Sequence, residues 1–410
     1  MNHSINIIGL GYIGLPTALM FATHDIEVVG TDLNADLVNK LKDGILTFEE
    51  TGMEELLQSS NKKGIRYTTE YQKADVYIVA VPTPYDKNSK RIDPSYVISA
   101  VKSVLKVCGK GAIIVIESTV SPGTIDKYVR PAIIDNGFTP GVDVHLVHAP
   151  ERIIPGNMVY ELIHNSRTIG ADDPMIGEKV KSLYASFCRG EIIVTDIRTA
   201  EMTKVVENTY RDINIAFANE LAKICRSDDM DVYEIIRIAN KHPRVNILQP
   251  GPGVGGHCIS VDPWFLVGDY PGLANIILAA RKINDGMPRF VIHRVSQIMR
   301  ENGLSDVGRV GLYGLTYKED VDDTRESPTL QMLERMEDGL AGGMVQVYDP
   351  FVRENLVPNQ HHDFDSFLNS VDMVVIMVAH EHIKNNLNKL NGKIVLDTKN
   401  IHGLLKSYKL

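Results

Sequence analysis

The sequence predicts an α/β protein with two Rossmann-like domains joined by a long central helix or helical domain. Three observations support this fold class. The first third of the 410 residues alternates short apolar runs with helical patterns, and the last third repeats that alternation. Between them lies a long amphipathic stretch without Pro or Gly. Continuous apolar strands separated by helices are typical of a parallel sheet covered on both faces.

The elements of the first third follow in order along the chain. Strands are expected over residues 5–9, 27–31, 76–81, 112–117 and 144–148, and helices over residues 16–23 and 35–42. Asp93 and Pro94 read as the N-cap and first residue of another helix, because Pro fits the first helical turn.

The middle of the chain predicts one helix over residues 199–226. Its apolar residues recur at helical spacing over about seven turns, at Met202, Val205, Val206, Ile213, Phe217, Leu221 and Ile224. Such a helix suits a core, a connection between domains or a dimer surface. Further strands are expected over residues 309–314, 345–349, 372–379 and 393–398. We therefore expect domains over residues 1–196, 197–300 and 301–410, with a ligand cleft between the two α/β lobes.

Composition excludes several classes of protein. Lys and Arg number 43 against 52 Asp and Glu, a net charge of −9, which disfavours a dedicated nucleic-acid binder but permits a local basic cluster for an anionic ligand. No apolar run approaches the roughly 18 residues of a membrane span, and no targeting segment is evident, so we expect a cytoplasmic protein. The four cysteines are widely spaced, which predicts neither a metal site nor a disulfide framework.

A dinucleotide site is predicted at Gly9, Gly11 and Gly14, which form G-x-G-x-x-G between a strand and a helix. Asp32 ends the second strand, where a carboxylate accepts the ribose 2′-hydroxyl of NAD and repels the extra phosphate of NADP. The expected cofactor is therefore NAD. Thr83 and Thr119 follow later strands at the same edge and could face the cofactor, although each alone is more often a cap. The alternative is a glycine turn without a ligand.

Cys258 is the candidate nucleophile. Four glycines in six residues precede His257 and Cys258, which implies backbone passing very close to something. Asp262 and Pro263 follow as a predicted N-cap and first helical residue. A cysteine beside a helix N-terminus tends toward the thiolate. Most cysteines are inert, and the other three in this chain fit that description.

Polar groups elsewhere could complete an active site. Lys204 and Asn208 share a face of the long helix, with Arg211 a turn further on, and could bind a hydroxyl or oxyanion. Glu151 follows the strand over residues 144–148, at the carboxyl edge of the sheet. Lys318, Arg325 and Lys399 follow strands of the last domain and could bind phosphates if they converge. Each of these charges taken singly is more often a solvated surface group.

Together these residues resemble the nucleotide-sugar 6-dehydrogenase family, which acts on UDP-glucose, GDP-mannose and UDP-N-acetylmannosamine. The motifs that carry the resemblance are GLGYIG, VPTP, EST, APER, the Lys204 to Asn208 helix, GPGVGGHC and the segment from Lys318 to Arg325. They cover nearly the whole chain. Residues 242–248 and Arg152 resemble most the branch that oxidises UDP-N-acetyl-D-mannosamine to UDP-N-acetyl-D-mannosaminuronate, a product that suits a capsule or other surface polysaccharide.

The resemblance implies a four-electron oxidation of the sugar 6-hydroxyl to a carboxylate with two NAD. Cys258 would form a thiohemiacetal and then a thioester. Lys204 and Asn208, with a water near Thr119, would handle the hydroxyl proton and the oxyanions. Glu151 or Asp262 would be the base for hydrolysis, and the resemblance does not decide between them.

The resemblance also implies which residues bind the ligands. The domains would bind NAD over residues 1–196, dimerise over 197–300 and bind the UDP-sugar over 301–410. The cofactor contacts would be Tyr12, Ile13, Asp32, Thr83, Thr119 and Arg325, beside the three glycines. The substrate contacts would be Arg152, Ile153, Lys204, Asn208, Arg211, Gly255, Tyr317, Lys318 and Lys399. The protein would be a homodimer built on the long helix, in which His242 and Arg244 reach the partner's site, with no metal, nucleic acid or membrane insertion.

Three alternatives remain open. The same chemistry could act on UDP-N-acetylglucosamine, UDP-glucose or GDP-mannose. A two-electron β-hydroxyacid dehydrogenase also carries Lys and Asn on a long helix, but it needs neither Cys258 nor a second nucleotide lobe. A catalytically dead NAD-binding or regulatory protein would not need Cys258, Lys204, Asn208 and Glu151 together.

Overall fold

The computed structural model describes residues 4–256, 258–337, 344–404 and 406–410. His257 of the predicted thiol motif lies outside these residues. The chain forms two compact units, residues 1–207 and 208–410, and each is described by itself. Within the described residues, no helix is both long and apolar enough to cross a membrane.

Unit 1 is built on an eight-stranded sheet in the order β3-β2-β1-β4-β5-β6-β7-β8. Its strands are β1 (Ser4–Ile8), β2 (Glu27–Thr31), β3 (Arg66–Thr68), β4 (Val76–Val79), β5 (Ala112–Ile116), β6 (Val144–His148), β7 (Arg167–Ala171) and β8 (Ile192–Thr195). The five strands predicted in this part of the chain are all present. The order of β3-β2-β1-β4-β5 reverses at β1 and β4, which is where open α/β sheets bind ligands.

The five strands predicted from the sequence pair parallel with one another, as expected, but the sheet continues into two further strands and is not parallel throughout. β6 and β7 pair antiparallel, Val147 facing Ala171 and His148 facing Gly170, whereas β7 and β8 pair parallel. The segment between β6 and β7 leaves and re-enters the sheet at the same edge, so no crossover returns the chain to the start of β6. That return, through α6, places Glu151 and Arg167 at one end of neighbouring strands.

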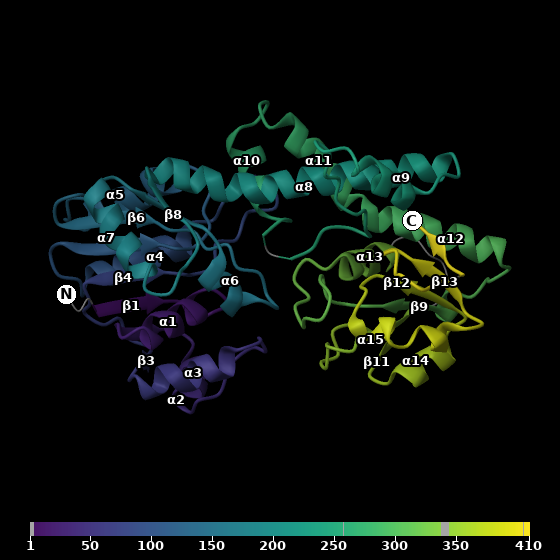
Figure 1. Ribbon diagram of the computed structural model, residues 1–410, viewed down its shortest axis with the longest axis horizontal. Coiled ribbons are helices and arrows are strands. Elements are labelled where there is room, and N and C mark those ends of the chain that lie inside the picture. The colour runs from purple at the N-terminus through teal and green to yellow at the C-terminus, as the bar shows by residue number, and fades with distance from the viewer. Residues whose placement is uncertain (1–3, 257, 338–343, 405) are drawn as a thin grey trace. The chain divides into compact units, whose positions relative to one another are not determined.

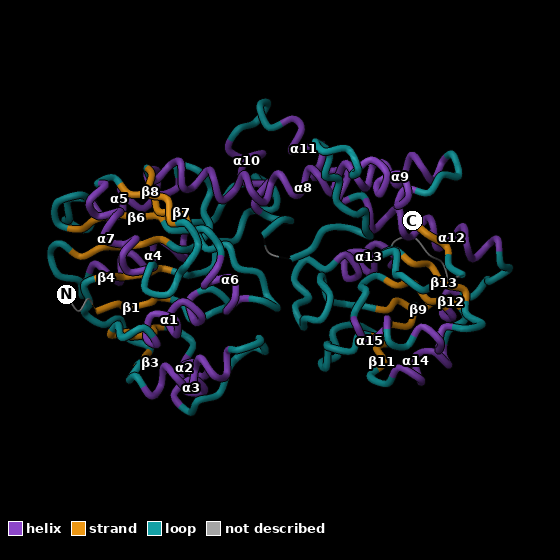
Figure 2. The backbone as a smooth tube through the Cα atoms, in the orientation of Figure 1, coloured by secondary structure: helices purple, strands orange, loops and turns teal. Residues whose placement is uncertain are grey.

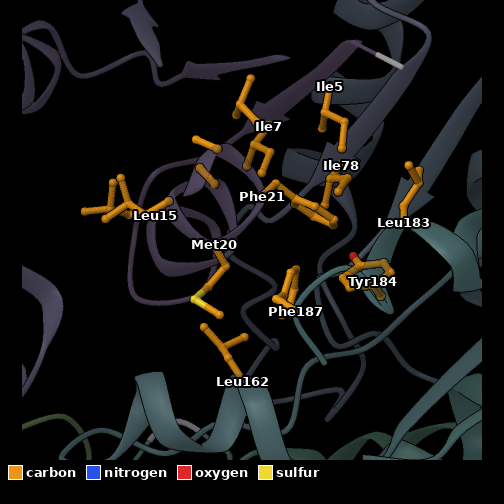
Figure 3. Close-up of a cluster of buried hydrophobic side chains, with 14 of the residues drawn as sticks. Ile5, Ile7, Leu15, Met20, Phe21, Ile78, Leu162, Leu183, Tyr184 and Phe187 are labelled. Atoms are coloured by element: carbon orange, nitrogen blue, oxygen red, sulfur yellow. The ribbon is translucent and has the colours of Figure 1, made fainter. Parts of the chain in front are cut away.

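Helices cover the sheet of unit 1 and close its core. They are α1 (Gly14–Thr23), α2 (Ala35–Lys42), α3 (Met53–Lys62), α4 (Ser95–Leu105), a π-helical turn (Ile125–Val129) that runs into α5 (Arg130–Asp135), α6 (Met158–His164) and α7 (Pro174–Tyr184). α4 begins one residue later than predicted, and Asp93 still accepts the Ser95 N–H at 2.9 Å. Figure 3 shows the core: β1 and α1 side chains meet those of α7, with the Phe21 ring 5.1 Å from that of Tyr184.

The predicted central helix is confirmed as α8 (Ile197–Ser227), 31 residues without a break (Figure 1). It has no Pro or Gly, so every residue can keep its helical hydrogen bond. Its first residues belong to unit 1 and the remainder to unit 2. The helix therefore supplies polar side chains to both units.

Unit 2 combines helices with a six-stranded sheet in the order β11-β10-β9-β12-β13-β14, whose neighbours all pair parallel. The strands are β9 (Val310–Tyr313), β10 (Gln346–Tyr348), β11 (Gln360–His361), β12 (Met373–Ile376), β13 (Ile394–Asp397) and β14 (Tyr408–Lys409). The order β10-β9-β12-β13 repeats β2-β1-β4-β5 of unit 1, so the expected second Rossmann-like lobe is confirmed. Figure 2 shows the strands of each sheet in orange among purple helices.

The helices of unit 2 besides α8 fall into two groups. α9 (Val232–Ala239), α10 (Asp262–Asp269), α11 (Asn275–Asp285) and α12 (Met287–Glu301) precede the sheet. α13 (Pro328–Glu337), α14 (Phe364–Ser370) and α15 (Glu381–Lys384) connect its strands. α12 and α13 pack beside one another against the core of this lobe.

Candidate active site

The three glycines after β1 each meet a different physical demand. Gly9 has φ +91°, and a Cβ there would lie 2.4 Å from the Ala80 carbonyl oxygen. A Cβ on Gly14 would lie 1.8 Å from the Gly9 oxygen, so α1 can approach the strand only with glycine at this position. A Cβ on Gly11 would meet nothing within 4 Å. Gly11 thus leaves open space beside the helix N-terminus, which suits the close approach of a pyrophosphate.

Asp32 anchors this loop from the end of β2. Its Oδ2 accepts the Leu10 N–H at 2.8 Å, and its Oδ1 accepts the Asn34 N–H at 2.8 Å. The residue is half-buried, and each carboxylate oxygen has a further lone pair for a ribose hydroxyl. These residues fit NAD, with the pyrophosphate at the glycine loop and the ribose at Asp32.

Four other predicted cofactor residues lie around the same sheet edge. Tyr12 stacks on Phe48 with ring centroids 4.4 Å apart, which fixes its ring beside the glycine loop. Ile13 and Thr119 are half-buried, and Thr83 is buried. Thr119 follows Ser118, whose hydroxyl donates to the Val81 carbonyl at 2.7 Å and ties the two loops together.

Glu151 lies in a buried charge cluster. The Arg167 guanidinium forms an ion pair with Glu151 and reaches Glu117 at 3.3 Å, and all three side chains are buried. Burial raises the pKa of Glu117 to about 7, against the opposing effect of Arg167. The second oxygen of Glu151 accepts the Arg152 N–H at 2.6 Å. The Glu151 carboxylate, predicted as a possible base, is therefore held in place by the Arg167 ion pair and the Arg152 N–H.

Arg152 makes its contacts inside unit 1. Its guanidinium binds Glu207 at 2.7 Å, the Ser166 carbonyl at 2.8 Å and the Thr168 hydroxyl at 2.8 Å. These contacts hold the APER segment to β7 and α8. Ile153, the other predicted substrate contact in this segment, is buried in the core of unit 1.

Lys204 is buried, yet its ammonium makes no hydrogen bond or ion pair with the part of the chain that the structure describes. A buried cation without a partner is costly and is typical of a group whose partner is a ligand. His148 lies close enough for the Lys204 charge to act on it: burial, together with this charge, lowers the pKa of His148 to about 4. The His148 Nδ1 donates to the Ile116 carbonyl at 2.8 Å, and the lowered pKa leaves the imidazole neutral.

The face of α8 that carries Lys204 and Asn208 is polar but not solvated. Glu201, Lys204, Asn208 and Asp212 follow at spacings of three and four and are all buried, which removes the alternative of a solvated stripe for this face. Glu201 accepts the backbone N–H groups of residues 123 and 125, so it caps the π-helical turn that follows Thr119. Arg211, a turn beyond Asn208, is exposed.

Asn208 is held by Asp262. Its amide nitrogen donates to the Asp262 Oδ2 at 2.6 Å, and both side chains are buried. The prediction that Asp262 is an N-cap is wrong. Val261 occupies the cap position and Asp262 is the first residue of α10. Because it lies inside the helix, its carboxylate accepts from the Asn208 amide rather than capping the helix.

The glycine-rich loop before Cys258 packs on the segment between β9 and α13. A Cβ on Gly255 would lie 2.6 Å from the Tyr317 Cβ, and one on Gly256 would lie 2.7 Å from its ring. The Gly256 N–H donates to the Arg325 carbonyl at 2.9 Å. Cys258 itself is exposed and takes part in no disulfide, and its carbonyl accepts the Asp262 N–H at 2.9 Å. The loop thus presents a thiol beside the predicted substrate segment.

The loop after β9 in the second lobe is held by an acid in the same way as the glycine loop of unit 1, but here the acid is fully buried. Asp349, at the end of β10, accepts the Leu315 N–H at 2.6 Å as Asp32 accepts that of Leu10. Asp349 and His380 are both fully buried and lie 3.3 Å apart. The acid that corresponds to Asp32 is buried against His380 and is not accessible to a ribose, so this lobe is not a second copy of the NAD site.

The predicted basic residues of unit 2 differ in exposure. Lys318 and Tyr317 are half-buried, and Arg325 is exposed and ion-paired with Asp323 at 2.6 Å. Lys399 follows β13, and burial lowers its pKa although Glu319 and Asp397 oppose the effect. His242 and Arg244 are exposed in the segment after α9.

Sequence reasoning missed several buried partners: Glu117 and Arg167 in unit 1, Glu201 on α8, and Asp212 with Arg281 in unit 2. Arg281 and Asp212 form a fully buried ion pair at 2.6 Å. Glu201 and Asp212 share the helical phase of Lys204 and Asn208, and that signal could have extended the predicted polar face in both directions. Nothing local marks Arg167, whose strand was not predicted. Among the described residues, no group of three or more His, Cys, Asp or Glu side chains could hold a metal ion.

Comparison with known proteins covers nearly the whole chain. Residues 3–188, 198–286 and 311–403 match the NAD binding domain, central domain and UDP binding domain of the UDP-glucose/GDP-mannose dehydrogenase family. A UDP-N-acetyl-D-mannosamine dehydrogenase of Methanocaldococcus jannaschii is 42% identical over 97% of this chain and 92% of its own. An NDP-N-acetyl-D-galactosaminuronic acid dehydrogenase of Ralstonia nicotianae is 39% identical over 97% of this chain and 96% of its own.

A solved structure agrees with these relatives. The UDP-N-acetyl-mannosamine dehydrogenase Cap5O from Staphylococcus aureus is 41% identical and superposes with a TM-score of 0.88, over 99% of this chain and 98% of that one. The chain belongs to the UDP-glucose/GDP-mannose dehydrogenase family and is an NAD-dependent nucleotide-sugar dehydrogenase.

Proposed function

We propose that the protein oxidises the 6-hydroxyl of UDP-N-acetyl-D-mannosamine to a carboxylate, consuming two NAD and releasing UDP-N-acetyl-D-mannosaminuronate. The observation that carries this proposal is the exposed Cys258 on a glycine loop packed against Tyr317. A two-electron dehydrogenase has no use for such a thiol, whereas a four-electron one needs a nucleophile to hold the aldehyde. The names of relatives 42–44% identical over nearly the full chain support the substrate.

Lys204 is the group that handles the hydroxyl proton. It is buried and lacks a partner among the described side chains, so a substrate oxygen would satisfy it. As the C6 hydroxyl gives up its proton, the carbon loses a hydride, and bound NAD supplies the acceptor for that hydride. Glu201 caps the turn after Thr119 and so fixes this loop to the helix that carries Lys204. A water held near Thr119 would carry the proton away.

Cys258 turns the aldehyde into a substrate for a second oxidation. Its thiolate adds to the C6 carbonyl and forms a thiohemiacetal oxyanion, and loss of the second hydride leaves a thioester. Asn208 donates one amide hydrogen to Asp262 and keeps the other for an oxyanion. Lys204 supplies the positive charge.

Of the two candidate bases for hydrolysis of the thioester, we favour Asp262. Its backbone N–H donates to the Cys258 carbonyl at 2.9 Å, which ties the first residue of α10 to the turn that carries the thiol. Glu151 instead is ion-paired with Arg167 and accepts its neighbour's N–H. Water attacks the thioester carbonyl as Asp262 takes its proton, and the thiolate leaves. Under this assignment, Asp262→Asn accumulates a covalent adduct on Cys258, and Glu151→Gln does not.

The UDP moiety would bind along the second lobe. Tyr317 and Lys318 lie in the loop after β9, and Lys399 follows β13, all at the carboxyl edge where α/β sheets hold ligands. Burial lowers the pKa of Lys399, and the nearby Glu319 and Asp397 offset this only in part. A diphosphate would restore the favourable charge balance. Arg152, Ile153 and Arg211 stay predicted sugar contacts.

The exposed side of α8 supports a homodimer. Tyr210, Phe217 and Ile224 recur every seven residues with 63%, 49% and 51% of their surfaces exposed. Apolar residues at that spacing form a seam that a second helix can cover. We propose that a second copy of this chain covers it and that His242 and Arg244, both exposed, reach the partner's substrate. Phe217→Glu should give monomers in size-exclusion chromatography with light scattering, whereas Glu220→Ala should leave the dimer intact.

The substrate assignment is tested by kcat/KM for NADH production from a panel of nucleotide sugars. UDP-N-acetylmannosamine should exceed UDP-N-acetylglucosamine, UDP-N-acetylgalactosamine and UDP-glucose by at least about tenfold, because several polar contacts distinguish epimers. Preference for UDP-N-acetylgalactosamine would place the chain with the Ralstonia relative instead. The product would feed a surface polysaccharide, and a cytoplasmic location stays a prediction for cell fractionation.

A further inference from the structure

Unit 2 contains a basic cavity of about 460 Å³, lined by none of the residues assigned to NAD and the nucleotide sugar. It is lined by Arg226 at the end of α8 and by the α12 residues Phe290, His293, Arg294, Ser296, Gln297 and Arg300. No acidic side chain is among them. The volume falls within the range of small-molecule sites, and the lining stands out in a chain of net charge −9.

Arg294 is the least expected residue of this cavity, because it is a buried cation whose close partners are all neutral. Only 6% of its surface is exposed. Its Nε donates to the Lys409 carbonyl at 3.3 Å, its Nη1 donates to the Gln297 side-chain oxygen at 2.9 Å, and its guanidinium lies 5.5 Å from the Tyr408 ring. Arg294 on α12, the helix that Figure 1 labels, thus contacts residues of both α12 and β14. A buried charge is normally paired with an opposite one.

The surroundings of Arg294 add to its positive charge. Burial lowers the pKa of Arg294 and the neighbouring Arg226 lowers it further, against smaller opposing effects of Glu301 and Asp229. Arg226 is itself paired with Asp229 at 2.8 Å, but that carboxylate is almost fully exposed to water and screened by it. Two guanidinium groups therefore face one cavity without a buried anion.

The other cations of the cavity are available to a ligand. Arg300 and His293 are exposed, and neither side chain bonds to another described residue. Arg226 and Arg300 lie in the last turns of α8 and α12, where the helix dipole favours a cation without any ligand. That explanation does not extend to Arg294, which lies in the middle of α12.

We propose that this cavity binds a phosphorylated small molecule, with the phosphate between Arg226, Arg294 and Arg300. The planar guanidinium fork matches phosphate oxygens, and an anion here would relieve both the repulsion between Arg226 and Arg294 and the burial of the latter. Phe290 supplies an apolar wall for the organic part of the ligand. The cavity shares no residue with the proposed reaction site, so ligand binding here does not depend on the proposed function.

The test is calorimetric titration of the full-length protein with pyrophosphate, at constant ionic strength and with saturating NAD and UDP so that their phosphate sites are filled. Saturable binding is expected for the wild type, and Arg226→Gln and Arg300→Gln should each weaken it at least about tenfold. Arg237→Gln, which removes an exposed arginine of α9 paired with Glu234, should leave it unchanged. Both test residues are at helix ends and at least partly exposed, so these variants should fold even if Arg294→Gln does not.

Three outcomes overturn the proposal. One is the absence of saturable binding, and another is equal affinity in Arg226→Gln, Arg300→Gln and the wild type. The third is equally effective competition by chloride, which marks an adventitious ion only. A second titration identifies the source of the phosphate: a nucleoside monophosphate that binds more tightly than a sugar phosphate, and loses this advantage in Phe290→Ala, points to a nucleotide.

Discussion

Replacing Arg167 by Leu should destabilise the protein strongly, and more at pH 8 than at pH 5.5. Arg167 is 3% exposed and is the shared partner of Glu117 and Glu151, themselves 1% and 7% exposed. Removing one member of a buried ion pair costs about 3–5 kcal/mol, because the remaining charge is left uncompensated. Two carboxylates lose their partner here, so we expect a loss near the upper end of that range at pH 8.

The pH dependence follows from Glu117, whose pKa burial raises to about 7. At pH 5.5 this carboxyl is already protonated in the wild type, so the substitution leaves one buried charge rather than two. Without Arg167 the folded-state pKa of the carboxyls rises further above the unfolded value of about 4.5. The folded variant then holds more protons than the unfolded chain, and its stability falls as the pH rises through that window.

The measurement is the free energy of unfolding in urea, followed by circular dichroism at both pH values. Arg189→Leu is the matched control, because Arg189 lies in the same unit and is exposed, with only a carbonyl contact. It should change stability by less than about 0.5 kcal/mol. A loss of under about 1 kcal/mol for Arg167→Leu, or an equal loss at both pH values, would refute the reasoning about this charge cluster.

Three further predictions concern the cofactor, the thiol loop and a buried acid. Asp32→Ala should raise KM for NAD about 10–100-fold, since hydrogen bonds to a charged group contribute about 1.5–3 kcal/mol, while kcat at saturating NAD changes less; an unchanged KM would remove Asp32 from the ribose site. Gly255→Ala should lower kcat/KM for the nucleotide sugar, because its Cβ would lie 2.6 Å from that of Tyr317, whereas Gly251→Ala has open space and should be neutral in the same kinetic assay. Burial raises the pKa of Glu201 to about 7, so this group makes the wild type lose up to about 3 kcal/mol of stability between pH 4.5 and 7. Denaturation of Glu201→Gln across that range should lack this slope, and an identical slope would contradict the assignment.

Local sequence patterns were sufficient for the parts of the fold that repeat. Gly9, Gly11 and Gly14 predicted the first loop because the backbone requires glycine at Gly9 and Gly14, while Gly11 leaves open space beside the helix N-terminus. The spacing of apolar residues predicted α8 to within two residues at each end, since a helix of 31 residues averages over local exceptions. The second lobe followed from its likeness to the first.

Features set by tertiary contacts could not be predicted in this way. The antiparallel pairing of β6 and β7 depends on the direction in which a loop returns, which no local pattern records. The sequence predicted Asp262 to be an N-cap, but its side chain binds Asn208, 54 residues earlier in the chain. No local sequence pattern marked Arg167 as part of a charge cluster, because its two partners are 16 and 50 residues away. Buried ion pairs of this kind are visible only once the strands are placed side by side.

The measurement that tests the proposed reaction most directly is the amount of NADH formed per UDP-N-acetylmannosamine consumed, for the wild type and Cys258→Ser. The wild type should form two NADH per sugar and release the uronate. Cys258→Ser should stall before the second oxidation, because the serine hydroxyl is a far weaker nucleophile than a thiolate. One NADH per sugar in the wild type, with Cys258→Ser unaffected, would contradict the thioester route and restore a two-electron dehydrogenase.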